Sequence, residues 1–193
     1  MNIKPVHRQY WALGLLAMLM AVTRFHHEGS AFALPDASLA VFYLGGLYLP
    51  SRRDFIALLA LAAVVDYLAI NSLGVSAYCM SPAYLFMIPT YGLMWLAGAW
   101  FSRQPHTALT AQASQFAGSV MLSASLAFLV SNGSFFWFSG KVSAVSLIEY
   151  ARGLSGFYIP YLGAAAGYAV LGLALVGVLR AVAIQVSAKP KLS

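Results

Sequence analysis

Long runs of apolar residues, separated by short polar turns, constrain this chain more than any other feature. The first run extends from Tyr10 to Val22 and is not followed by a cleavage site and a soluble domain, so we expect it to stay as a helix. A helix needs about 20 apolar residues to cross the hydrocarbon core of a bilayer. The residues are 61% hydrophobic and 8% charged, whereas soluble domains carry roughly 25% charged residues. The sequence therefore predicts an integral membrane protein.

Six transmembrane helices with short connections account for nearly the whole chain, so we expect one all-α transmembrane domain over residues 1–193. Strands are disfavoured because the apolar runs are continuous, whereas the strands of membrane barrels alternate at period two. Residues 132–141 are expected to form an aromatic-rich loop, and residues 142–152 a short amphipathic helix. The expected spans are residues 9–25, 36–49, 55–70, 82–101, 108–130 and 156–183.

Basic residues are distributed unequally between the two ends of these helices. Three of the 11 Lys and Arg residues, Arg24, Lys141 and Arg152, lie on one side, and the other eight lie opposite. Cytoplasmic loops carry an excess of Lys and Arg, so both termini are predicted to be cytoplasmic. The net charge of +6 then reflects membrane topology, and we expect no nucleic-acid partner. No ATPase is expected either, because the glycine spacing in residues 133–141 does not match a phosphate-binding loop.

Two residues stand out by their chemistry. Asp66 lies near the outer end of the third expected helix, where a carboxylate is costly, by about 2.5 to 3.5 kcal/mol at mid-helix. It is either functional or a structural acid hydrogen-bonded to a neighbouring helix or loop. Cys79 is the only cysteine and precedes an expected helix, a position that lowers the pKa of a thiol and favours the metal-binding thiolate. The alternative is a small buried hydrophobic residue.

Further polar candidates lie on the same outer side. His26 and His27 are adjacent, so both cannot point one way from a helix, and they make a poor two-histidine metal site. Tyr84 and Tyr91 are seven residues apart, on one face of the fourth expected helix, a spacing that is also typical of packing. Arg152 either extends to the lipid headgroups or binds an anionic group with its planar fork.

Small residues indicate close helix contacts. Ala17 and Ala21 are four residues apart on the first helix, and Gly163, Gly167 and Gly172 interrupt the last one. Such faces let helices approach closely. They serve either packing within the bundle or the docking of another membrane protein.

These features together resemble the substrate-binding S-component of an energy-coupling factor (ECF) transporter. The shared features are six helices in a short chain, cytoplasmic termini, no nucleotide motif and Ala-xxx-Ala on the first helix. A closer resemblance, to the BtuM family of small cobalamin S-components from Gram-negative bacteria, rests on five scattered residues. They are His27, Asp66, Cys79 within Tyr-Cys-Met-Ser-Pro, Tyr84 and Arg152.

The resemblance implies a function. The chain would bind cobalamin at its outer face and deliver it across the bacterial inner membrane with a separate energising module of one membrane subunit and two ATPases. Cys79 would be an axial cobalt ligand, with His27 or His26, Asp66, Tyr84 and Arg152 around the corrinoid. Cobalt accepts thiolate, and a corrin leaves only two axial positions, so one cysteine suffices. The thiolate could also displace cyanide from cyanocobalamin, which would be a chemical step without a conventional active site.

Three other functions stay open at this stage. The chain could be an S-component for another small vitamin or a metal. It could be a thiol-dependent membrane enzyme that acts on the corrinoid. It could also be a structural membrane protein that binds no ligand.

Overall fold

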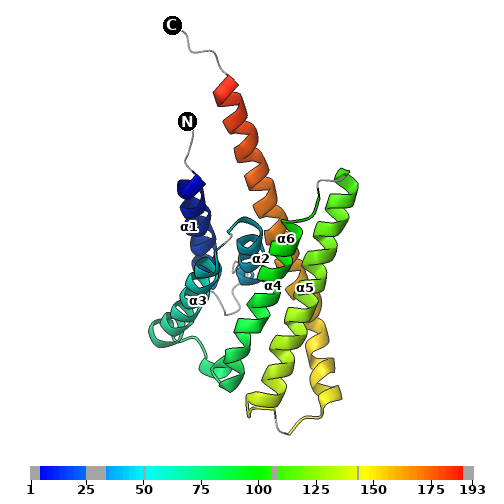
Figure 1. Cartoon of the computed structure of the whole chain (residues 1–193). Helices are drawn as coiled ribbons and strands as arrows, with labels where there is room; N and C mark the ends of the chain where they lie inside the picture. The colour runs from blue at the N-terminus through cyan, green and yellow to red at the C-terminus, as the bar shows by residue number, and fades with distance from the viewer. Residues whose placement is uncertain (1–4, 25–33, 50, 106–107, 143, 189–193) are drawn as a thin grey trace.

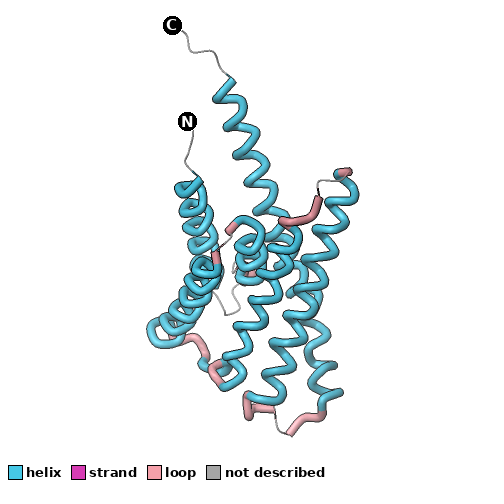
Figure 2. Tube along the Cα trace, viewed as in Figure 1, coloured by secondary structure: helices cyan, strands magenta, loops and turns pink. Residues whose placement is uncertain are grey.

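Helices account for almost all of the described chain. The computed structural model describes residues 5–24, 34–49, 51–105, 108–142 and 144–188, and these contain six α-helices, two short 3-10 helices and no strand (Figure 2). The predicted all-α class is therefore confirmed for this part of the chain. In order, the helices are α1 (Pro5–Arg24), α2 (Ser38–Tyr48), α3 (Arg52–Leu73), η1 (Ala77–Cys79), η2 (Pro82–Phe86), α4 (Met87–Phe101), α5 (Leu109–Phe138) and α6 (Leu147–Ala188).

Three of these helices are long and apolar enough to cross a membrane. The candidate spans are Arg52–Ser72 in α3, Leu109–Phe138 in α5 and Leu147–Leu179 in α6. Their outer surfaces carry large apolar side chains that are mostly exposed, such as Leu122, Leu129, Ile159 and Leu171. Exposed apolar surface on this scale suits lipid and not water. The structure therefore fits a membrane protein, as the sequence predicts.

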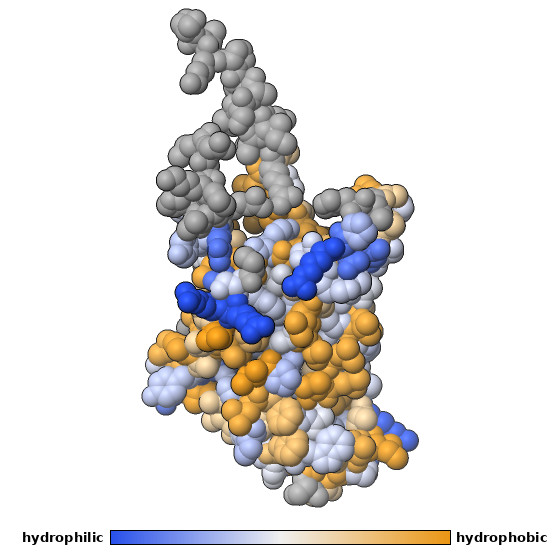
Figure 3. All heavy atoms as spheres, viewed as in Figure 1, coloured by the Kyte–Doolittle hydropathy of each residue, from blue (hydrophilic) through white to orange (hydrophobic). Residues whose placement is uncertain are grey.

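Both ends of the described chain lie at one end of the bundle. Figure 1 shows the start of α1 and the end of α6 at the top, together with the start of α5. Figure 3 shows strongly hydrophilic side chains across the middle of this face, with a broad, mainly hydrophobic surface below them. That both termini lie on one side of the membrane, the cytoplasmic side, stays a prediction.

Two segments differ from the expected boundaries. α5 continues to Phe138, so the predicted loop over residues 132–141 is wrong for residues 132–138. α6 begins at Leu147 and runs on without a break, so the predicted separate amphipathic helix over 142–152 is wrong. The aromatic residues at the end of α5 contact α6, for example through the rings of Phe136 and Tyr150 at 5.2 Å. Gly153 and Gly156 do not interrupt α6 because a break would leave backbone groups unpaired, which is costly in lipid.

The other helices also start or end a few residues from the predicted positions. α3 begins at Arg52 because Ser51 caps it, accepting a hydrogen bond from the Arg53 N–H. The expected fourth helix begins as the 3-10 turn η2, and only from Met87 is it α-helical. α2 has 11 residues, which rise about 16 Å, roughly half of the hydrocarbon thickness. It is enclosed, with residues 38–46 buried.

Glycines let α2 approach its neighbours closely. A Cβ atom at Gly46 would collide with the backbone carbonyl of Trp95 in α4, and one at Gly98 with the carbonyl of Tyr43 in α2. Gly172 of α6 faces the Leu44 side chain, whereas Gly163 and Gly167 meet open space. Of the three glycines singled out in the last helix, only Gly172 therefore marks a close contact within the described chain.

We expect Gly98→Ala to lower the thermal stability of the purified protein. The added methyl group meets backbone and not a flexible side chain, and overpacking of this kind typically costs about 1–3 kcal/mol. Gly92→Ala is the matched control, because a Cβ there, in the same helix, has no atom within 4 Å. Thermal unfolding in detergent measures both variants. Equal Tm values for the two would contradict the close contact between α2 and α4.

Candidate functional site

A buried arginine organises the polar residues near the end of α1. Arg24 is the last residue of that helix and is only 4% exposed. Its Nε donates to Asp66 Oδ1 at 2.6 Å, and its Nη2 donates to Asp66 Oδ2 at 2.7 Å. This two-bond geometry is the strong form of an arginine–carboxylate pair. It joins α1 to α3.

The third nitrogen of the same guanidinium reaches two further helices. Arg24 Nη1 donates to Ser38 Oγ at 2.8 Å, at the start of α2, and to Tyr91 OH at 2.6 Å, in α4. It also lies 3.3 Å from Asp36 Oδ2. Asp36 Oδ1 in turn accepts hydrogen bonds from the backbone and the hydroxyl of Ser38. One side chain therefore ties four helices together.

Tyr84 completes this group from η2. Its hydroxyl donates to Asp66 Oδ2 at 2.7 Å, so Asp66 accepts three hydrogen bonds. The group combines one positive and two negative side chains. We refer to Arg24, Asp36, Ser38, Asp66, Tyr84 and Tyr91 as the arginine cluster.

The arginine cluster brings together two residues of the predicted site. Asp66 and Tyr84 lie on different elements, 18 positions apart, and are hydrogen-bonded. Tyr91, which was placed on the same face as Tyr84, belongs to the cluster as well. The alternative interpretation of Asp66, a structural acid paired with neighbouring elements, accounts for the same bonds.

Arg24 is not predicted as a site residue from the sequence, where it stands only among the outer basic residues. A signal was present, because an arginine that ends an apolar run requires an acidic partner when it is buried. Its partner Asp66 is 42 residues away, however, and no spacing rule connects two positions on different helices. Ser38 is missed for the same reason.

Cys79 is the last residue of η1, between α3 and η2, and its side chain lies outside the part of the chain that the structure describes. The turn itself is anchored by its neighbours. Lys141 Nζ donates to the carbonyl of Tyr78 and lies 4.6 Å from the centre of the Tyr78 ring. That ring also packs against Phe135 of α5, with centroids 5.4 Å apart. The end of α5 therefore holds the segment that carries the cysteine.

The remaining predicted site residues are not joined to this group by the described contacts. Arg152 lies in α6 with an exposed side chain, and its role stays a prediction. His26 and His27 lie outside the described residues. A cleft of about 620 Å³ between α5 and α6 is lined by Tyr150, Ala151 and other residues, but not by Arg152. Within the described chain, no three His, Cys, Asp or Glu residues are grouped to hold a metal ion.

No family model matches the chain, and no curated protein matches it. The resemblance to cobalamin S-components therefore rests on the residues named above.

Proposed function

We propose that this chain is the cobalamin-binding S-component of an ECF transporter, with six membrane crossings and both termini in the cytoplasm. The observation that carries the proposal is the hydrogen bond between Tyr84 and Asp66. These are two of the five residues on which the resemblance rests, and they come from the elements on either side of η1, which bears Cys79. The apolar outer surface supports the membrane location.

The arginine cluster suggests how these residues bind a corrinoid. Corrin side chains carry amide N–H groups, which need oxygen acceptors such as the Asp66 carboxylate. Arg24 holds that carboxylate from one side with two hydrogen bonds. Tyr84 can therefore transfer its hydrogen bond to a ligand without leaving Asp66 buried and unpaired. Arg152 would bind the phosphate of the nucleotide arm, and His27 or His26 would approach from the first outer loop.

Cys79 would bind cobalt as the thiolate. If cyanide occupies that position, the cobalt–carbon bond breaks as the cobalt–sulfur bond forms. Cyanide leaves with its electron pair and takes up a proton, and the oxidation state of cobalt does not change. The energising module, one membrane subunit with two ATPases, would then move the cargo inward. Ala17 and Ala21 are proposed to contact the membrane subunit of the energising module. Both are partly buried, and Ala17 packs against the chain's own core.

Protein purified from cells fed cobalamin is expected to carry corrin absorption bands, at about one corrinoid per chain. Tyr84→Phe should weaken binding about two- to twelvefold, because a net hydrogen bond contributes about 0.5–1.5 kcal/mol. Tyr67→Phe is the matched control, since Tyr67 follows Asp66 in α3 and is 62% exposed.

The outcomes separate the competing functions. Absence of corrin bands in the wild-type protein would reject the proposal and favour another vitamin, a metal or a structural role. Repeated release of corrinoid with a changed upper ligand, over many catalytic cycles, would favour a membrane enzyme that acts on the corrinoid.

A further inference from the structure

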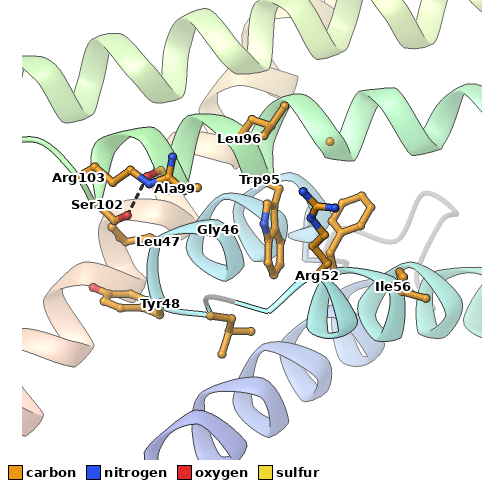
Figure 4. A pocket seen from close by; sticks show the side chains of 13 residues that line it. Gly46, Leu47, Tyr48, Arg52, Ile56, Trp95, Leu96, Ala99, Ser102 and Arg103 are labelled. Carbon is orange, nitrogen blue, oxygen red and sulfur yellow. Dashed lines mark hydrogen bonds between the residues drawn. The ribbon is translucent and has the colours of Figure 1, made fainter. Parts of the chain in front are cut away.

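A second cleft, of about 830 Å³, opens where α3 begins and α4 ends (Figure 4). Residues of α2, α3 and α4 line it, and none of them belongs to the arginine cluster. Asp66 lies 14 positions beyond Arg52 in α3, about 21 Å along a helix. The cleft is therefore a separate feature, near the opposite end of α3.

Two arginines give this cleft its charge. Arg52 begins α3, Arg103 follows the end of α4, and both side chains are exposed. Figure 4 shows both extending from the cleft wall, with Trp95 between them in this view. Neither guanidinium has a hydrogen bond or an ion pair with any described residue; both ion pairs within the described chain belong to Arg24. Among the described residues, the two positive charges of the cleft are therefore unpaired.

An apolar wall continues from each arginine along its helix. Ile56 is four positions after Arg52, and Leu96 is seven positions before Arg103, so each lies on the helix face below the charge. Ile56 is 62% exposed and Leu96 67% exposed. Free phosphate would engage the arginines and leave this wall uncovered. A molecule with an anionic head and an acyl chain would cover both.

We propose that this cleft binds an anionic phospholipid, with its phosphate between Arg52 and Arg103 and an acyl chain along Ile56 and Leu96. Arginine pairs with phosphate through two parallel hydrogen bonds. Basic pockets between transmembrane helices bind anionic headgroups, and tryptophan is enriched at the level of the interface. The site does not depend on the cobalamin proposal. It requires only that α3 and α4 are embedded in lipid.

The test uses the full chain, purified in a neutral detergent, with phosphatidylglycerol as the probe and phosphatidylcholine as the neutral lipid. Native mass spectrometry counts the lipids that stay bound. Wild type should retain phosphatidylglycerol in preference to phosphatidylcholine. Arg52→Gln with Arg103→Gln should reduce this retention about thirtyfold, since each arginine contributes about 1 kcal/mol near an anionic headgroup. Arg53→Gln should not, because Arg53 is exposed beside Arg52 but does not line the cleft.

A second readout keeps the test independent of folding defects. Phosphatidylglycerol should raise the Tm of the wild type and of Arg53→Gln, but not that of the double variant. Equal retention in all variants would overturn the proposal. Stabilisation by inorganic phosphate equal to that by the lipid would overturn the assignment to a phospholipid and indicate a simple anion site. A lipid-free dimer in the mass spectrum would assign the cleft to a second copy of the chain and would likewise overturn it.

Discussion

Arg24→Ala is expected to destabilise the protein by about 3–5 kcal/mol, the usual cost of removing one partner of a buried ion pair. The substitution leaves Asp66, which is 9% exposed, with a single hydrogen bond from Tyr84. It also removes the donor shared by Ser38 and Tyr91. Because four helices lose their common contact, the effect should exceed that of any exposed arginine. Thermal unfolding in detergent measures it, with Arg53→Ala as the exposed control.

A paired substitution shows whether Arg24→Ala destabilises the protein through the unpaired charge of Asp66 or through lost packing. Replacing a buried ion pair by apolar residues of similar size is often close to neutral. Arg24→Met combined with Asp66→Leu should therefore recover much of the stability that Arg24→Ala loses. If Arg24→Ala unfolds at the wild-type temperature, the ion pair does not hold the helices together. If the double variant is no more stable than the single one, the bonds to Ser38 and Tyr91 carry the effect instead.

Hydropathy was enough to predict the all-helical class, because lipid leaves few ways to satisfy backbone hydrogen bonds. Hydropathy failed at the end of α5, where it predicted a loop for residues 132–138. Their polar side chains bond back to the helix itself, as Asn132 Nδ2 does to the Phe128 carbonyl at 2.9 Å. The aromatic rings that follow gain contacts with α6 and η2, including Phe138 stacked on Phe86 at 5.0 Å. Such contacts arise between elements, and local sequence does not show them.

The site was predictable to a similar degree. Asp66 could be singled out because a carboxylate within an apolar run is costly, and Tyr84 because it shares a helix face with Tyr91 and belongs to the residues of the resemblance. Arg24 could not be paired with Asp66, since their contact depends on how α1 and α3 pack. The same packing places Asp36 and Ser38 beside the guanidinium. A charged residue within an apolar run can thus be recognised from the sequence as a member of a buried polar group. Which of these residues contact one another depends on how the helices pack.

Cys79→Ala is expected to abolish direct sulfur ligation of cobalt while leaving weaker corrinoid binding. In the proposed site, Asp66 and Tyr84 would bind the corrin periphery and not the cobalt. On mixing with cyanocobalamin, wild-type protein should shift the visible spectrum and release about one cyanide per chain, because a strongly donating thiolate replaces it on cobalt. The variant should keep the spectrum of cyanocobalamin and release none. Absorbance and a cyanide electrode record the two quantities separately.

Met80→Ala is the matched control for this experiment. Met80 is the next residue, is 43% exposed and carries the other sulfur atom of the segment. Its removal tests whether any change near η1 disturbs the spectrum, and we expect ligation and cyanide release to persist.

The competing ligand is the imidazole of His27. If Cys79→Ala binds corrinoid with an unchanged spectrum and His27→Ala does not, the histidine takes the metal and the cysteine only packs in its turn. Since a thiolate must lose its proton before it binds, ligation by Cys79 should also weaken as the pH falls, and that dependence should vanish in Cys79→Ala.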